Sequence, residues 1–159
     1  MLIIDASSMI YGWDNYPIEQ FPKVWEWTET QIKERELQIP GVAFEEVFHK
    51  LPECCAWLKE RACEIIAETN AILTAALQIK NLLGIHNDDY HVKGVDENDL
   101  LVIATAKVAG ASLLSDEKRQ LKLPDIRKKM KIPAVCALPE VNVVCKSFLE
   151  YLKGSRAVF

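Results

Sequence analysis

Residues 95–117 read Val-Asp-Glu-Asn-Asp-Leu-Leu-Val-Ile-Ala-Thr-Ala-Lys-Val-Ala-Gly-Ala-Ser-Leu-Leu-Ser-Asp-Glu, which is the pattern of a helix followed by a short strand. Asp96 is expected to cap the helix, and Asp99, three residues on, completes a pair like a capping box. Apolar residues then recur at helical spacing, at Leu100, Ile103, Ala104 and Val108. Gly110 is typical of a helix end, and Ala111–Ser115 is expected to be extended. The stretch therefore predicts one half of an α/β unit.

That strand ends in two acids, Asp116 and Glu117. If the strand is parallel to its neighbours, its carboxyl end lies at the edge where such sheets bind ligands. Asp99, in the first turn of the preceding helix, has to reach the same edge if the acids form one site. Either Asp116 or Glu117 can be the acid that does so.

Two more acids follow the same pattern towards the N-terminus. Asp5 comes directly after the apolar run Met1–Ile4, which is typical of a buried strand in a parallel sheet. Taken alone, Asp5 is equally well explained as a helix N-cap. Glu46 lies in the predicted helix Val42–Leu51, next to the buried-side residue Val47, which distinguishes it from its neighbour Glu45.

The rest of the chain alternates between short strands and amphipathic helices, which indicates the α/β class. Tyr11–Phe21 is predicted to be a loop with one helical turn at most. A helix is expected from Pro22 to Glu36, and a long helical region from Cys54 to Leu83, interrupted at Thr69-Asn70. Further predictions are a strand at Leu37–Ile39, a loop at Gly84–Gly94, a short helix or turn at Ile132–Cys136, a strand at Val141–Cys145 and a last helix from Ser147 to Lys153.

The composition excludes several classes of protein. With 159 residues, half of them hydrophobic, the chain can bury the core of one domain. No apolar run is long enough to span a membrane. The N-terminal apolar residues follow no basic segment, and Leu2–Ile4 is too short for a signal peptide, so a cytoplasmic protein is expected. The five cysteines form no Cys-x-x-Cys pair and are expected to be reduced core thiols. The three histidines lack the spacing of zinc ligands.

A net charge of −4 argues against a protein that coats nucleic acid through bulk charge. One segment is nevertheless basic, because between positions 118 and 131 the only acid is Asp125. Taken alone, such a segment is explained as a solvated surface. Its place directly after the acidic strand end makes it a candidate for contacts with nucleic-acid phosphates. Its basic residues are Lys118, Arg119, Lys122, Arg127, Lys128, Lys129 and Lys131.

Acids that gather at one edge repel one another unless cations neutralise them. The hard oxygen ligands of carboxylates suit Mg²⁺ or Mn²⁺. Paired divalent ions at such a site activate a water and stabilise the leaving oxygen in phosphodiester hydrolysis. The acids that we expect to converge are Asp5, Glu46, Asp99 and Asp116 or Glu117, and capping alone does not explain why all of them fall at strand ends or first turns.

With these acids in this order, the chain resembles the PIN-domain family of metal-dependent ribonucleases, many of which are VapC-like toxins of toxin–antitoxin pairs. The resemblance covers nearly the whole chain, and the helix that begins at Asp99 is its most specific part. Ile132-Pro133-Ala134-Val135-Cys136, the aromatic residues after the first strand and the Trp-bearing helix make the chain most similar to an uncharacterised prokaryotic branch of that family.

The resemblance implies a three-layer PIN-like α/β fold, with a central parallel sheet of four or five strands, over residues 1–153. The terminal residues 154–159 are expected to fray. The resemblance further implies Asp5, Asp99 and Asp116 or Glu117 as metal ligands, with Glu46 as a further catalytic acid. Ser7 and Ser115 match hydroxyl positions that orient the ligands. It also implies an RNA substrate, a protein antitoxin and a homodimer.

The leading hypothesis is therefore a Mg²⁺- or Mn²⁺-dependent endoribonuclease acting as the toxin of a toxin–antitoxin pair. A second hypothesis is a PIN-like binding module without catalysis, which the acidic net charge and the Ser115-Asp116-Glu117 departure from the family's Thr-Asn-Asp favour. A third is a nuclease outside any toxin system. The toxin role rests on analogy of fold and motif.

Overall fold

The computed structural model describes residues 1–159 and contains one five-stranded sheet. The strand order is β3-β2-β1-β4-β5, and every pair of neighbours is parallel. The strands are short, as predicted for a buried parallel sheet: β1 (Leu2–Ile4), β2 (Leu37–Pro40), β3 (Ile65–Ile66), β4 (Ser112–Leu114) and β5 (Cys145–Lys146). The prediction of a parallel sheet of four or five strands is confirmed.

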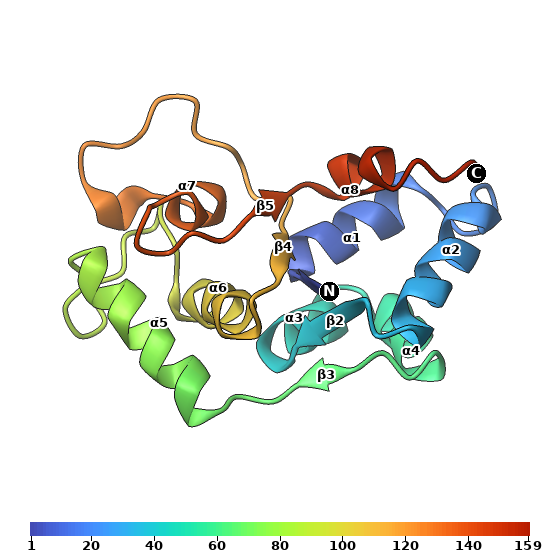
Figure 1. Cartoon of the computed structure of the whole chain (residues 1–159), viewed down its shortest axis with the longest axis horizontal. Coiled ribbons are helices and arrows are strands. Elements are labelled where there is room, and N and C mark those ends of the chain that lie inside the picture. The colour runs from blue at the N-terminus through green and yellow to red at the C-terminus, as the bar shows by residue number, and fades with distance from the viewer.

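Helices cover both faces of this sheet, so the molecule has three layers. Figure 1 shows α5, α6 and α7 on one side of the sheet and α2, α4 and α8 on the other. The eight α-helices are α1 (Ala6–Asn15), α2 (Pro22–Lys33), α3 (Gly41–Lys50), α4 (Pro52–Glu60), α5 (Asn70–Leu82), α6 (Glu97–Ala109), α7 (Ile132–Cys136) and α8 (Phe148–Ser155). No helix is long and apolar enough to cross a membrane.

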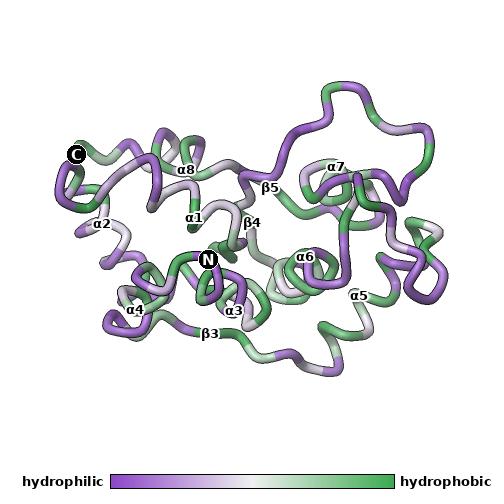
Figure 2. Tube along the Cα trace, turned by 180° about the vertical axis from the view of Figure 1, so that it is seen from behind, coloured by the Kyte–Doolittle hydropathy of each residue, from purple (hydrophilic) through white to green (hydrophobic).

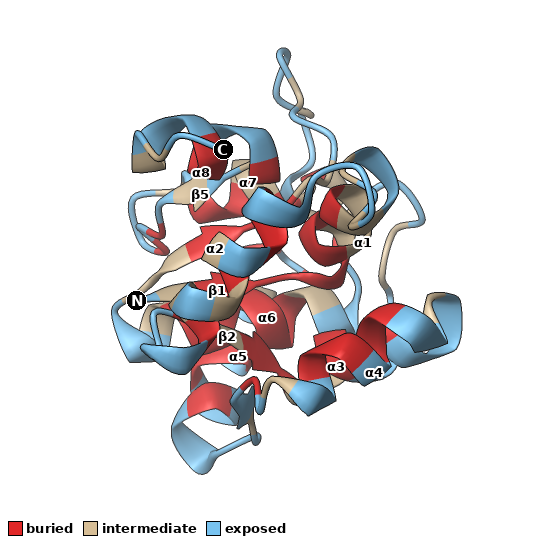
Figure 3. Cartoon of the chain, turned by 90° about the vertical axis from the view of Figure 1, so that its right-hand side faces the viewer, coloured by how far each residue is buried: buried red, intermediate tan, exposed pale blue.

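Helix α6 and strand β4 form as the sequence predicts. Asp96 and Asp99 make a complete capping box, and Gly110 ends the helix with a φ of 61°, a conformation that favours glycine. All residues from Leu100 to Ala106 are buried, because α6 packs between the sheet and its neighbouring helices. Figure 3 shows α6 coloured as buried beside β1 and β2.

The predicted loop at Tyr11–Phe21 is wrong over its first half, because α1 continues to Asn15. Gly12 and Asn15 suggested a break. In the structure Gly12 is buried, and a Cβ built on it would lie 2.8 Å from the ring of Phe148. The glycine therefore permits close packing of α1 against α8 and does not mark a turn.

The predicted helical region Cys54–Leu83 is also wrong in part. Its interruption is real, since Thr69 caps α5 by accepting a hydrogen bond from the Ile72 backbone. However, α4 ends at Glu60, and the chain then extends to pair β3 with β2. The apolar residues Ile65 and Ile66 matched the helical stripe because short apolar runs suit either structure. The strand predicted at Val141–Cys145 pairs only at its end, in β5.

The core contains aromatic residues and thiols. Trp13, Trp25 and Trp57 pack edge to face at centroid distances of 5.0–6.1 Å. Four of the five free cysteines are buried, which confirms their assignment to the core. At the C-terminus α8 extends to Ser155, and the ring of Phe159 lies 5.5 Å from that of Trp27. Figure 2 shows apolar segments near the sheet and a largely hydrophilic loop after β4.

Candidate functional site

The order of the strands determines where a ligand can bind. β1 is the central strand of the sheet. β2 and β3 lie on one side of it, and β4 and β5 lie on the other. The carboxyl ends of β1 and β4 are therefore the switch point of the sheet, where connections leave in opposite directions and where open α/β sheets bind ligands. Asp5 follows β1 directly, and Ser115, Asp116 and Glu117 follow β4. The predicted acids of both strands thus lie at this switch point.

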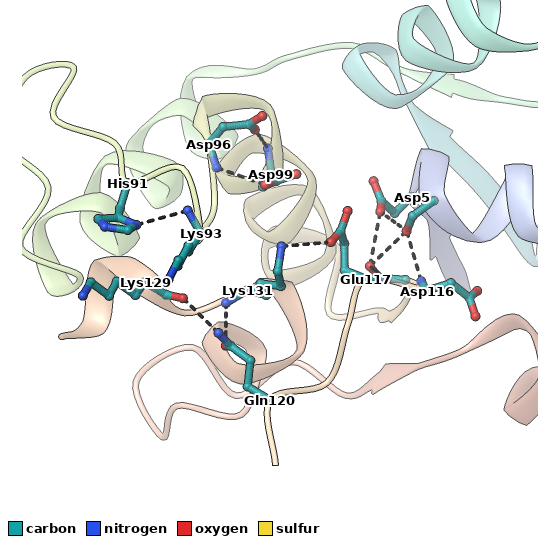
Figure 4. A network of polar contacts seen from close by, with 12 residues as sticks. Asp5, His91, Lys93, Asp96, Asp99, Asp116, Glu117, Gln120, Lys129 and Lys131 are labelled. Atoms are coloured by element: carbon teal, nitrogen blue, oxygen red, sulfur yellow. Dashed lines mark hydrogen bonds and ion pairs between the residues drawn. The ribbon is translucent and has the colours of Figure 1, made fainter. Parts of the chain in front are cut away.

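Asp5 is only 4% exposed, and two serines fix one of its oxygens. Ser7 Oγ donates to Asp5 Oδ2 at 2.5 Å, and Ser115 Oγ donates to the same oxygen at 3.2 Å. These hydroxyls in turn accept from the backbone, Ser7 from Asp116 N and Ser115 from Glu117 N. The network, drawn in Figure 4, holds the ends of β1 and β4 together and leaves Oδ1 of Asp5 without a hydrogen bond.

The pKa values of Asp5 and Asp99 show which neighbouring charges act on these two acids. The pKa of Asp5 is raised to about 6, chiefly by burial and in part by the charges of Glu46 and Glu117, against the hydrogen bond from Ser7. The pKa of Asp99 is likewise raised to about 7, chiefly by burial, and the charges of Asp96, Asp5 and Glu117 contribute to this rise. The charges of Glu46 and Glu117 therefore reach Asp5, and those of Asp5 and Glu117 reach Asp99.

Two of these acids have basic partners, which the sequence analysis did not expect. Lys50 Nζ lies 2.6 Å from Glu46 Oε1, one helical turn away on α3. Lys131 Nζ lies 3.6 Å from Glu117 Oε2. No basic side chain lies within ion-pair distance of Asp5 or Asp99. The i,i+4 spacing of Glu46 and Lys50 is the signal in the sequence that pointed to the first of these pairs.

Asp116 has a different environment from Glu117. Its Oδ2 accepts hydrogen bonds from Ser8 Oγ at 2.5 Å and from the backbone N of Phe148 at 2.9 Å. These bonds connect β4 to α1 and to the first turn of α8. In Figure 4 the Asp116 carboxylate points away from Asp5 and Glu117. The buried Ser8 was not singled out in the sequence, where nothing separates it from Ser7.

The basic segment forms the long loop between Glu117 and Lys131, including the 3-10 helix Arg127–Lys129. Gln120 closes it by donating to Lys129 O at 3.0 Å and accepting from Lys131 N at 2.8 Å, as Figure 4 shows. Two of its predicted phosphate-binding residues are engaged elsewhere, Arg119 with Glu150 and Lys128 with Asp89. Those without an ion pair are Lys118, Lys122, Arg127 and Lys129.

The carboxylate oxygens fit a divalent-metal site that water and substrate complete, but not one in which protein side chains supply all the ligands. No three or more His, Cys, Asp or Glu side chains are arranged to hold a metal by themselves. Asp5 and Asp99 each have one carboxylate oxygen fixed by hydrogen bonds, to Oδ2 in both cases, and one free. One or two carboxylates completed by water and substrate phosphate are what Mg²⁺ sites use in proteins.

Comparison with known proteins supports the fold. A family model described as "Domain of unknown function (DUF4411)" matches residues 2–159. A chain of VapBC2 from Rickettsia felis, solved with a DNA fragment from its promoter, is 15% identical, with a TM-score of 0.56. A chain of DNA-bound VapBC from Salmonella typhimurium is 14% identical, with the same TM-score. Each likeness covers 92% of this chain and 97% of the other. No curated protein matches.

At these identities the two VapBC structures show a shared fold and no more. The fold is the three-layer, PIN-like α/β arrangement that the sequence predicted, with an all-parallel sheet at its centre.

Proposed function

The chain belongs to the DUF4411 family, and we propose that it is a metal-dependent endoribonuclease that hydrolyses RNA phosphodiester bonds. The observation that carries this proposal is the pair of carboxylates Asp5 and Asp99. Both have raised pKa values, neither has a basic partner, and Asp5 lies at the switch point of the sheet. Keeping such groups charged at neutral pH is unfavourable unless a cation binds between them.

Bound Mg²⁺ or Mn²⁺ would supply the Lewis acid that activates a water and offsets charge on the phosphate. Asp5 and Asp99 would hold the ion through their free oxygens. Ser7 and Ser115 fix the orientation of Asp5, so the ligand is ordered before binding.

We assign Glu117, in preference to Asp116, as the acid from β4. The charge of Glu117 acts on both Asp5 and Asp99, whereas Asp116 already accepts two hydrogen bonds that connect α1 and α8. Glu46 completes the set. Lys50 and Lys131 neutralise Glu46 and Glu117, which leaves the net negative charge of the site on Asp5 and Asp99.

RNA would lie along the loop that follows Glu117. The unpaired cations Lys118, Lys122, Arg127 and Lys129 are available for phosphate contacts, which carry no sequence information. The loop begins at Glu117 and ends at Lys131, which form an ion pair. An RNA strand whose phosphates bind the loop would therefore reach the acids.

The test is cleavage of a labelled single-stranded RNA by the purified protein with Mn²⁺, with Mg²⁺ and with EDTA. Asp5→Asn and Asp99→Asn are expected to abolish cleavage while circular dichroism stays unchanged. Asp14→Asn, an exposed carboxylate on α1, is the matched control and is expected to cleave like wild type. Cleavage that persists in EDTA or in both site variants would refute the proposal.

A toxin role, with a protein antitoxin as partner and a homodimer as its assembly, is supported by the likeness of the fold to the VapBC chains. Expression in a bacterial host is then expected to arrest growth for wild type but not for Asp99→Asn. Co-expression of a small reading frame adjacent to the gene is expected to restore growth. If cells that express the active protein grow normally, the toxin role is refuted, and a nuclease outside any toxin system is the remaining hypothesis.

One observation favours a non-catalytic binding module as the second candidate. Glu46 and Glu117 each have a lysine partner, so half of the acids are neutralised without metal. This candidate requires RNA or protein binding that chelators leave unchanged and that Asp99→Asn does not weaken.

A further inference from the structure

A second feature of the same sheet edge is a large cleft beside the acids, of about 750 Å³. It lies where β2 leads into α3 and β3 leads towards α5, with the start of α6 as its third wall. Glu46 and Asp96 line it, so it is continuous with the site that contains Asp5 and Asp99. In the strand order the cleft lies over β2 and β3, and the basic loop leaves from β4, on the other side of β1.

The charge of the cleft excludes phosphate. Four carboxylates line it, from Glu45, Glu46, Glu68 and Asp96. The only lysine in its wall, Lys50, is already paired with Glu46. A phosphate group would be repelled here, whereas the unpaired cations of the loop attract it. A strand of RNA that crosses the acids would therefore keep its backbone on the loop side and direct a base into the cleft.

The floor of the cleft suits an uncharged, flat ligand. It is formed by Val42, Phe44 and Ile65, and Ile65 is 44% exposed although it belongs to a strand of the sheet. Bases of single-stranded RNA that proteins read are unstacked and packed against such apolar and aromatic surfaces. The volume exceeds that of a single base, so a nucleotide can enter with its sugar.

Two of the polar groups around this floor are acceptors without a partner, beside His49 and Asn98, which can also donate. Glu45 and Glu68 make no ion pair or side-chain hydrogen bond within the protein, and carboxylates only accept. Guanine presents two adjacent donors, N1–H and N2–H, on its Watson–Crick edge, which match the two oxygens of one carboxylate. Adenine and cytosine present one donor beside an acceptor, and uracil presents a single donor between two acceptors.

From these contacts we propose that the cleft binds the guanine base of a nucleotide next to the scissile bond, recognised by Glu45 or Glu68. The inference rests on the proposed function, because it assigns the base preference of that ribonuclease. Glu45 and Glu68 are specificity residues and take no part in hydrolysis.

Binding tests this without requiring cleavage. Fluorescein-labelled UUGUU, UUAUU, UUCUU and UUUUU are titrated with the wild-type protein in EDTA and followed by fluorescence anisotropy. The guanine oligonucleotide is expected to bind about 10- to 100-fold more tightly than the other three. Glu45→Gln or Glu68→Gln is expected to shift the preference towards UUAUU, because an amide matches the donor and acceptor of adenine. Glu53→Gln, an exposed acid on α4, is the matched control.

Equal affinities for the four oligonucleotides, or a guanine preference that survives in both glutamine variants, would overturn the inference. Weak binding of all four together with tight binding of an arginine-rich peptide would overturn it too, and would assign the cleft to a basic protein segment. Guanine-selective binding without metal-dependent cleavage would refute the proposed function alone. Cleavage without base preference would refute the cleft assignment alone.

Discussion

Replacing Asp5 by asparagine is expected to stabilise the metal-free protein. Burial raises the pKa of Asp5 to about 6 in the folded state, whereas the group has its ordinary value of 3.8 in the unfolded chain. Between these two pH values the folded protein binds more protons than the unfolded chain, so its stability falls as the pH rises. Above pH 6 the cost is complete and corresponds to about 3 kcal/mol.

The amide side chain that Asp5→Asn introduces retains an oxygen that can accept from Ser7, and it carries no charge, so the substitution removes this cost. At pH 8 in EDTA the variant is expected to be more stable by up to about 3 kcal/mol, or about 6 to 12 °C in Tm. The difference is expected to fall to about half at pH 5 and to vanish below about pH 3, where Asp5 is protonated in both states.

Thermal and urea denaturation followed by circular dichroism measure this difference at each pH. Asp14→Asn, which removes an exposed carboxylate, is expected to change stability by less than about 0.5 kcal/mol at any pH. Mn²⁺ is expected to stabilise wild type more than the variant, so the difference in stability between the two proteins becomes smaller. A variant that is no more stable than wild type at pH 8, or a gap that does not depend on pH, would refute the reasoning.

Four further variants test separate parts of the structure. Glu117→Gln is expected to reduce RNA cleavage by about 10- to 100-fold with an unchanged Tm. Asp116→Ala is expected to lower Tm, because Ser8 Oγ and Phe148 N lose their acceptor. The opposite pattern would make Asp116 the catalytic acid. Gly12→Ala is expected to cost about 1 to 3 kcal/mol in urea denaturation because its Cβ meets the Phe148 ring, and an unchanged midpoint would contradict this packing. Thr69→Ala is expected to cost about 1 kcal/mol by removing the cap of α5, and no loss of stability would show that the cap does not contribute.

The sequence was sufficient where local signals agree with the tertiary structure. The capping pair Asp96 and Asp99, the buried stripe of α6 and the stop at Gly110 all follow from patterns within one short segment. The placement of Asp5 and Glu117 at one edge followed from the rule that parallel strands end on the same side.

The sequence was insufficient where a contact between distant segments decides the structure. Gly12 lies within a helix and not at a turn, and the reason for the glycine is the ring of Phe148, far along the chain, which packs where a side chain would be. Ile65 and Ile66 form a strand because β2 has an edge for them to pair with. The hydrogen bonds that distinguish Asp116 from Glu117 come from α1 and α8, so no reading of the Ser115-Asp116-Glu117 segment alone could separate these acids.

Binding of Mn²⁺ measured by titration calorimetry tests the central claim, that Asp5 and Asp99 are a metal site. Wild type and Asp99→Asn are compared at pH 7.5 after circular dichroism has shown that both are folded. Wild type is expected to bind Mn²⁺ with release of protons, since the pKa of Asp99 is about 7 without metal, and the variant is expected not to bind. Equal binding by the two proteins would contradict it, because the metal would then lie elsewhere and Asp99 would only cap α6.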